Sequence, residues 1–61
     1  MDQIEKIILE LTDLHNITKD EEALQEEGEN YVFGRIEELT TELYELVGEE
    51  KTQEILNKIN S

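Results

Sequence analysis

The sequence predicts an all-α protein, a small bundle of three to four short helices. Proline is absent, glycine occurs three times, and the apolar residues recur at the three- and four-residue steps that place side chains on one face of a helix. A chain of 61 residues has room for one domain, which we expect to span residues 1–61. Because a chain this short buries only about 60% of the surface that its unfolded form exposes, its core is small.

The first helix is predicted over residues 2–15. Five apolar residues follow helical steps there: Ile4, Ile7, Ile8, Leu11 and Leu14. Asp2 is a good residue to cap the start, and the His15–Asn16 pair is typical of a helix end. We therefore expect this helix to stop near residue 15, with His15 interacting with the last backbone carbonyls.

A short helix is predicted over residues 19–27. Thr18 is followed three residues later by Glu21, which is the capping-box pattern, and Gly28 is a natural stop. The acids of this segment have no cation one turn away, which weakens the helix. The alternative is one continuous helix through Gly28, at a cost of about 1 kcal/mol for the glycine. It is suggested by apolar residues spaced seven apart, Ile17, Leu24 and Tyr31.

The strongest pattern predicts a helix over residues 30–47. Its apolar residues step by four and three, as in the seam of a left-handed helix pair: Val32, Ile36, Leu39, Leu43 and Leu46. Aromatic residues beside the seam are expected to fill or flank the core. Gly34 lies inside this helix; close approach of another helix would explain it, and simple tolerance of the glycine is the alternative.

Gly48 is predicted to end that helix and to form the turn of a helical hairpin with a last helix at 49–60. Acids open the last helix and Lys58 closes it, which matches the helix dipole. We expect the central helix to pack on both neighbours. A homodimer through its apolar seam is one way for so small a chain to complete its core.

The charge of the chain is strongly one-sided. Asp and Glu number 17 against 5 Lys and Arg, which gives a formal net charge of −12. This charge opposes direct binding of nucleic acid or anionic lipid and favours a partner protein with a basic surface. No apolar run is long enough to cross a membrane and no export signal is evident, so a cytoplasmic location is expected.

The residues for catalysis are poorly represented. The chain has one histidine and no cysteine, so neither a nucleophile with its usual base nor a thiolate metal site is predicted. Carboxylates one turn apart, such as Glu38 and Glu42, could in principle hold a cation, but a solvated face is the simpler interpretation. We therefore predict no enzyme, no cofactor and no metal site.

Two clusters of acids are the candidate partner-binding residues. The first lies in the short second helix and its approach: Asp20, Glu21, Glu22, Glu26 and Glu27. The second lies between Arg35 and Lys51: Glu37, Glu38, Glu42, Glu45, Glu49 and Glu50. Four members of the second cluster step by four, three and four and would form one row: Glu38, Glu42, Glu45 and Glu49. Tyr44 joins the candidates as a ring that flanks the core with its hydroxyl in solvent.

These features lead to a hypothesis of function. We expect a non-enzymatic inhibitor or regulator that occupies the basic face of a partner, one that otherwise binds nucleic acid. In size and charge the chain resembles the small acidic anti-restriction and anti-CRISPR inhibitors that phages encode. The resemblance is one of composition and includes no shared sequence motif. The alternative is a structural or self-associating helical module whose acidic surface only confers solubility.

Overall fold

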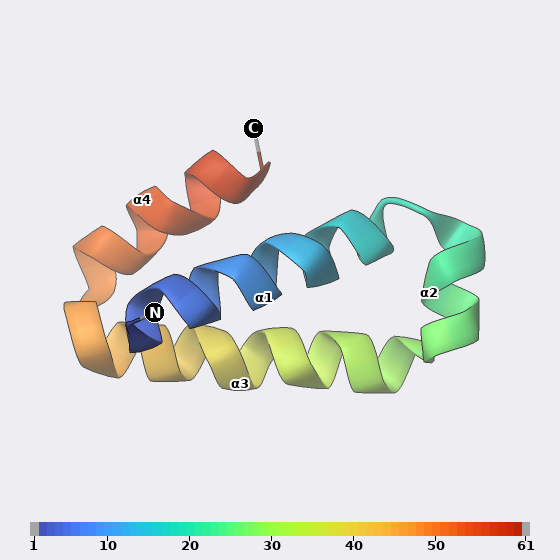
Figure 1. Ribbon diagram of the computed structural model, residues 1–61, viewed down its shortest axis with the longest axis horizontal. Coiled ribbons are helices and arrows are strands. Elements are labelled where there is room, and N and C mark those ends of the chain that lie inside the picture. The colour runs from blue at the N-terminus through green and yellow to red at the C-terminus, as the bar shows by residue number, and fades with distance from the viewer. Residues whose placement is uncertain (1, 61) are drawn as a thin grey trace.

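The computed structural model describes residues 2–60 and confirms the all-α fold (Figure 1). Within these residues it holds four α-helices and no strand: α1 (Gln3–Thr18), α2 (Glu21–Glu27), α3 (Glu29–Val47) and α4 (Glu49–Asn60). The long helices α1 and α3 lie side by side in opposite directions (Figure 1). α2 joins them at one end, and α4 folds back from the other end and contacts both. The extents are 32 × 21 × 21 Å.

α1 begins as predicted but ends later. The Asp2 carboxylate accepts a hydrogen bond from the backbone N–H of Ile4 at 2.7 Å, as an N-cap does. The helix then continues to Thr18, so the predicted end near His15 is wrong. Two contacts explain the extension: Ile17 packs against the core, and the Thr18 hydroxyl donates to the His15 carbonyl at 2.6 Å.

α2 is capped by a residue other than the one predicted. The Asp20 carboxylate accepts from the backbone N–H groups of Glu22 at 3.1 Å and Ala23 at 3.3 Å. The capping box of Thr18 and Glu21 is wrong because Thr18 still belongs to the last turn of α1. The short second helix itself was correctly predicted.

Glycines separate α2 from α3 and α3 from α4. Gly28 has φ +94° and Gly48 has φ +88°, in the left-handed region that glycine adopts without steric cost. Gly28 therefore ends α2, and the alternative of one helix running through it is wrong. The Gly48 N–H donates to the Tyr44 carbonyl at 2.8 Å, and the buried Thr52 hydroxyl donates back to the Gly48 carbonyl at 2.7 Å. These bonds fix the predicted turn between α3 and α4.

The core lies mainly between α1 and α3. Its buried apolar residues come from three helices: Ile7, Leu11 and Leu14 of α1, Leu24 of α2, and Val32, Leu39 and Leu43 of α3. α4 adds side chains that are only partly buried: Ile55, Leu56 and Ile59. The core residues of the predicted seam are thus covered within one chain. A homodimer stays a prediction, and it would have to use another surface.

Two expectations about α3 are wrong. Leu46, the last residue of the predicted seam, is 45% exposed. Val47, the next residue, packs against the core instead, so at this end of α3 the side that faces the core passes through Val47 and leaves Leu46 on a flank. Gly34 has no other atom within 4 Å of where a Cβ would stand, apart from its own helix, so no close helix approach accounts for it.

Candidate protein-interaction surface

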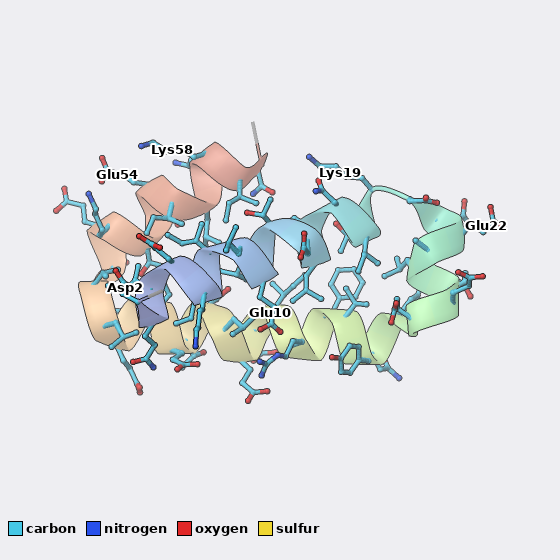
Figure 2. All side chains as sticks on the ribbon, in the orientation of Figure 1. Asp2, Glu10, Lys19, Glu22, Glu54 and Lys58 are labelled. Atoms are coloured by element: carbon cyan, nitrogen blue, oxygen red, sulfur yellow. The ribbon has the colours of Figure 1, made fainter. Side chains whose placement is uncertain are left out.

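The acids of the first predicted cluster gather at one end of the molecule. All five are exposed: Asp20, Glu21, Glu22, Glu26 and Glu27. α2 turns the chain at this end, and Figure 2 shows Glu22 pointing outward from it. Asp20 already uses its carboxylate to cap α2, so the other four are available to a partner.

The second cluster does not form the single row that the spacing predicted. Glu38, Glu42 and Glu45 share a side of α3, but Glu49 is the first residue of α4. The positive φ of Gly48 changes the direction of the chain between them, so the four-residue row is wrong. Glu49 and Glu50 instead line a surface hollow of about 680 Å³ at the α3–α4 turn, at the opposite end of the molecule from α2.

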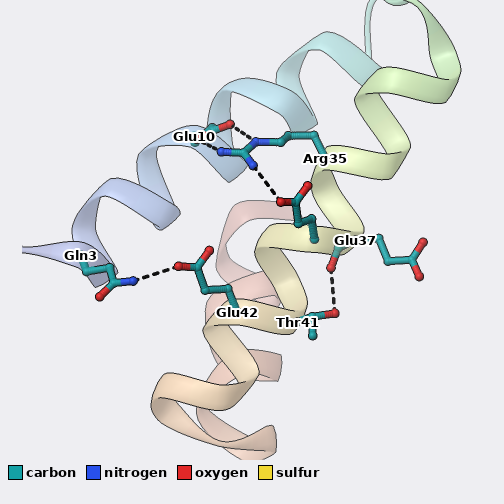
Figure 3. A network of polar contacts seen from close by, with 7 residues as sticks. Gln3, Glu10, Arg35, Glu37, Thr41 and Glu42 are labelled. Carbon is teal, nitrogen blue, oxygen red and sulfur yellow. Dashed lines mark hydrogen bonds and ion pairs between the residues drawn. The ribbon is translucent and has the colours of Figure 1, made fainter.

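Two members of that row are engaged inside the molecule. Glu38 lies 3.4 Å from Arg35, and Glu42 is half-buried and accepts a hydrogen bond from the Gln3 side-chain amide at 2.8 Å (Figure 3). The contact of Glu42 joins α1 to α3, whereas that of Glu38 lies within α3 and leaves its side chain largely exposed. Glu42 therefore contributes to helix packing as well as to surface charge.

A two-point polar contact between α1 and α3 was not predicted from the sequence. Arg35 Nε donates to Glu10 Oε2 at 2.6 Å, and Arg35 Nη2 donates to Glu10 Oε1 at 3.1 Å (Figure 3). This two-point bond lowers the pKa of the Glu10 carboxyl below its ordinary value, more than partial burial raises it. The same bond raises the pKa of the Arg35 guanidinium.

The signal for this contact was present in the spacing. Gln3 and Glu10 lie seven residues apart on α1, and their partners Glu42 and Arg35 lie seven apart on α3 in the reverse order. Opposed heptad steps are what an antiparallel helix pair requires.

The remaining acids of the second cluster form no ion pair with any residue from 2 to 60. Glu37, Glu45, Glu49 and Glu50 are all exposed. Within residues 2–60 the ion pairs join Arg35 to Glu10 and Glu38, and Lys51 to Glu54. Among the predicted site residues in this part of the chain, Glu38 is thus the one carboxylate with a cation beside it.

Large apolar side chains also reach the surface, and most of them were missed as site candidates. Tyr44, which was predicted, is 50% exposed. Four others are similarly exposed: Leu9, Tyr31, Phe33 and Leu46. Aromatic residues beside the seam were expected to fill or flank the core, and Phe33 flanks it. Its position one residue past the buried Val32 could have indicated a flank of the helix.

The single histidine does not bond as predicted. His15 Nε2 is buried and has no hydrogen-bond partner among the described residues, so it does not donate to the last carbonyls of α1. Over the same residues no group of three potential metal ligands lies close together. None of the described helices combines the length and hydropathy that crossing a bilayer requires.

Comparison with known proteins yields no relative: no protein-family model matches the chain, and neither a curated protein nor a solved structure is significantly similar to it. The interpretation of this surface therefore depends on its own chemistry.

Proposed function

We propose that the protein is a non-enzymatic inhibitor or regulator that binds the basic face of a partner protein, and that this face otherwise binds nucleic acid. The observation that supports this most is the exposure of carboxylates that no cation of the described chain neutralises. With a net charge of −12, such a surface attracts a basic partner over the distance of a Debye length, about 8 Å at physiological salt.

The distribution of the acids supports the mimicry of nucleic acid. Carboxylates occur at the α2 end, along α3 and at the α3–α4 turn, over a molecule 32 Å long. That length corresponds to about nine steps of a nucleic-acid strand at roughly 3.4 Å each. Neighbouring acids one helical turn apart are separated by about 5 Å along the axis, on the same scale as that charge spacing.

The exposed apolar side chains favour a second candidate, a helical interaction module that binds through apolar contacts. Its contacts would be made by the five large apolar side chains that are about half exposed or more: Leu9, Tyr31, Phe33, Tyr44 and Leu46. In this alternative the acids keep the protein soluble and add little to binding.

Affinity capture followed by competition distinguishes the two candidates. The immobilised chain is exposed to a lysate of its source cell at low salt, and the captured protein is identified by mass spectrometry and purified. We expect a protein with a basic surface that a short DNA or RNA duplex displaces. A captured protein with a neutral or acidic surface, or one that nucleic acid leaves in place, would contradict the proposal and favour the apolar module.

A charge-neutralised variant of α2 tests the same proposal within this chain. The variant replaces four exposed carboxylates by amides: Glu21→Gln, Glu22→Gln, Glu26→Gln and Glu27→Gln. Asp20 is kept, so α2 retains its cap. We expect slower association with the captured partner at unchanged helicity by circular dichroism. Glu54→Gln, which removes one exposed carboxylate near Lys51, is the control and should have a smaller effect.

A further inference from the structure

One face of α3 presents two aromatic rings to solvent. Phe33 is 52% exposed and Tyr44 is 50% exposed. They lie eleven positions apart in the sequence, close to three turns at about 3.6 residues each, so they share a side of the helix. The rise of about 1.5 Å per residue separates them by roughly 16 Å along the axis.

A single carboxylate lies between the rings. Glu37 follows Phe33 by one turn and precedes Tyr44 by two, and it is exposed. Thr41, one turn after Glu37, donates its hydroxyl to the Glu37 carbonyl at 2.9 Å, a bond that leaves the Glu37 carboxylate unused. We call Phe33, Glu37 and Tyr44 the α3 aromatic face.

The carboxylate of this face is not engaged in helix packing. Figure 3 shows the Glu37 side chain pointing away from Arg35, which faces α1 and bonds Glu10. In the part of the chain that the structure describes, no ion pair involves Glu37. Glu38 and Glu42, on the other side of α3, are by contrast held by Arg35 and Gln3.

Charge and aromatic area act differently in protein binding. Exposed charges mainly speed the encounter and select partners, whereas buried aromatic and arginine side chains supply most of the affinity of an interface. The acids of α2 have no aromatic residue beside them in the sequence of that helix. The α3 aromatic face contains both an exposed charge and exposed aromatic rings.

We propose that the α3 aromatic face is the anchor of the interaction and that it docks an arginine-bearing segment of the basic partner. Arginine fits because its planar guanidinium stacks on an aromatic ring and also bonds a carboxylate at two points. Lysine, a compact and strongly hydrated charge, satisfies the carboxylate but stacks less well. This inference rests on the proposed function, since it specifies where the basic partner is held.

A defined peptide tests the inference without knowledge of the natural partner. The probe is an amphipathic helical peptide of alanine, leucine and arginine, about 16 residues long, which spans the roughly 16 Å between the rings. Its analogue carries lysine at every arginine position. The dissociation constant is measured at low salt by calorimetry, and the contact surface is mapped by amide chemical shifts in NMR.

We expect Phe33→Ala and Tyr44→Ala each to weaken binding of the arginine peptide about five- to tenfold. Glu37→Gln, which leaves the rings and the fold intact, should weaken it as well and reduce the preference for arginine over lysine. The matched control is Tyr31→Ala, because Tyr31 is 61% exposed on the same helix but lies away from this face. It should bind like the unaltered protein.

The outcomes separate this inference from the proposed function. If the arginine peptide binds but the three face variants bind it normally while the α2 amide variant does not, the anchor is wrong and the proposed function stands. An equal loss with Tyr31→Ala would also overturn the anchor. If neither peptide binds the unaltered protein at low salt, the anchor is wrong, while the proposed function is decided by the capture and competition experiment.

Discussion

Gly34 shows how a single residue limits the stability of α3. It has helical neighbours on both sides, and no atom outside its own helix lies within 4 Å of where a Cβ would stand. An alanine side chain would fit there without a clash, and it would lower the conformational entropy of the unfolded chain. We therefore expect Gly34→Ala to stabilise the fold by about 0.5–1 kcal/mol. Urea denaturation followed by circular dichroism measures this.

Gly28→Ala is the control for that prediction. Gly28 has φ +94°, where an L side chain is strained whatever the space around it, so alanine should destabilise the protein. Destabilisation by Gly34→Ala would contradict the open space that surrounds this position in the structure.

At the same scale, Glu10 should make the stability of the fold depend on pH. Its ordinary pKa of 4.5 is lowered in the fold, chiefly by the hydrogen bond from Arg35. A carboxyl with a lowered folded pKa contributes stability that is fully present above its unfolded value and is lost as pH falls through the folded value. The unaltered protein should therefore exceed the Glu10→Gln variant in stability most near neutral pH, and this difference should shrink below about pH 4.5.

Thermal melts of the unaltered protein and Glu10→Gln, at several pH values on both sides of that point, measure the difference. Glu54→Gln is the matched control, since Glu54 pairs with Lys51 only at 3.9 Å and both side chains are largely exposed. It should change the melting temperature less near neutral pH, and its effect should vary less with pH. A Glu10→Gln difference that stays constant with pH would show that the bond to Arg35 does not stabilise the fold.

At the scale of the element, α2 depends on its cap. The helix spans Glu21–Glu27, so the bonds from Asp20 to two of its first amides are a large share of what holds it. Asp20→Ala should cost about 1 kcal/mol and expose the α2 amides to hydrogen exchange. Asp20→Ser keeps a capping oxygen without the charge and should retain most of the stability.

The Thr18→Ala variant tests whether α2 is capped by Asp20, as observed, or by Thr18, as the sequence predicted. Thr18 bonds within α1, so its replacement should leave exchange in α2 almost unchanged. Faster exchange in α2 with Thr18→Ala than with Asp20→Ala would contradict the assignment of Asp20 as the cap.

The helices themselves were largely predictable, but their ends were not. The apolar steps and the glycines at 28 and 48 are local signals, and the structure follows them. Thr18 and Asp20 are both good capping residues in sequence. The choice between them is made by Ile17, which packs on the core and draws one more turn into α1. That contact is tertiary, and no local pattern contains it.

At the scale of the whole molecule, the candidate surface was only partly predictable. Composition identified the acids, and nearly all of those selected are exposed, Glu42 being half-buried. The pairing of Glu10 with Arg35 and of Gln3 with Glu42 depends on how α1 and α3 align, which requires the register of two helices distant in sequence. The exposure of Phe33 depends on the same alignment.

The central claim is that the acidic surface recognises a basic partner, and the salt dependence of association tests it most directly. Raising ionic strength from about 0.05 to about 0.5 M shortens the Debye length from about 14 to about 4 Å. The association rate constant of the captured partner, measured by stopped flow or surface plasmon resonance, should fall at least tenfold over this range. A rate constant indifferent to salt would contradict the claim and leave the apolar module as the explanation.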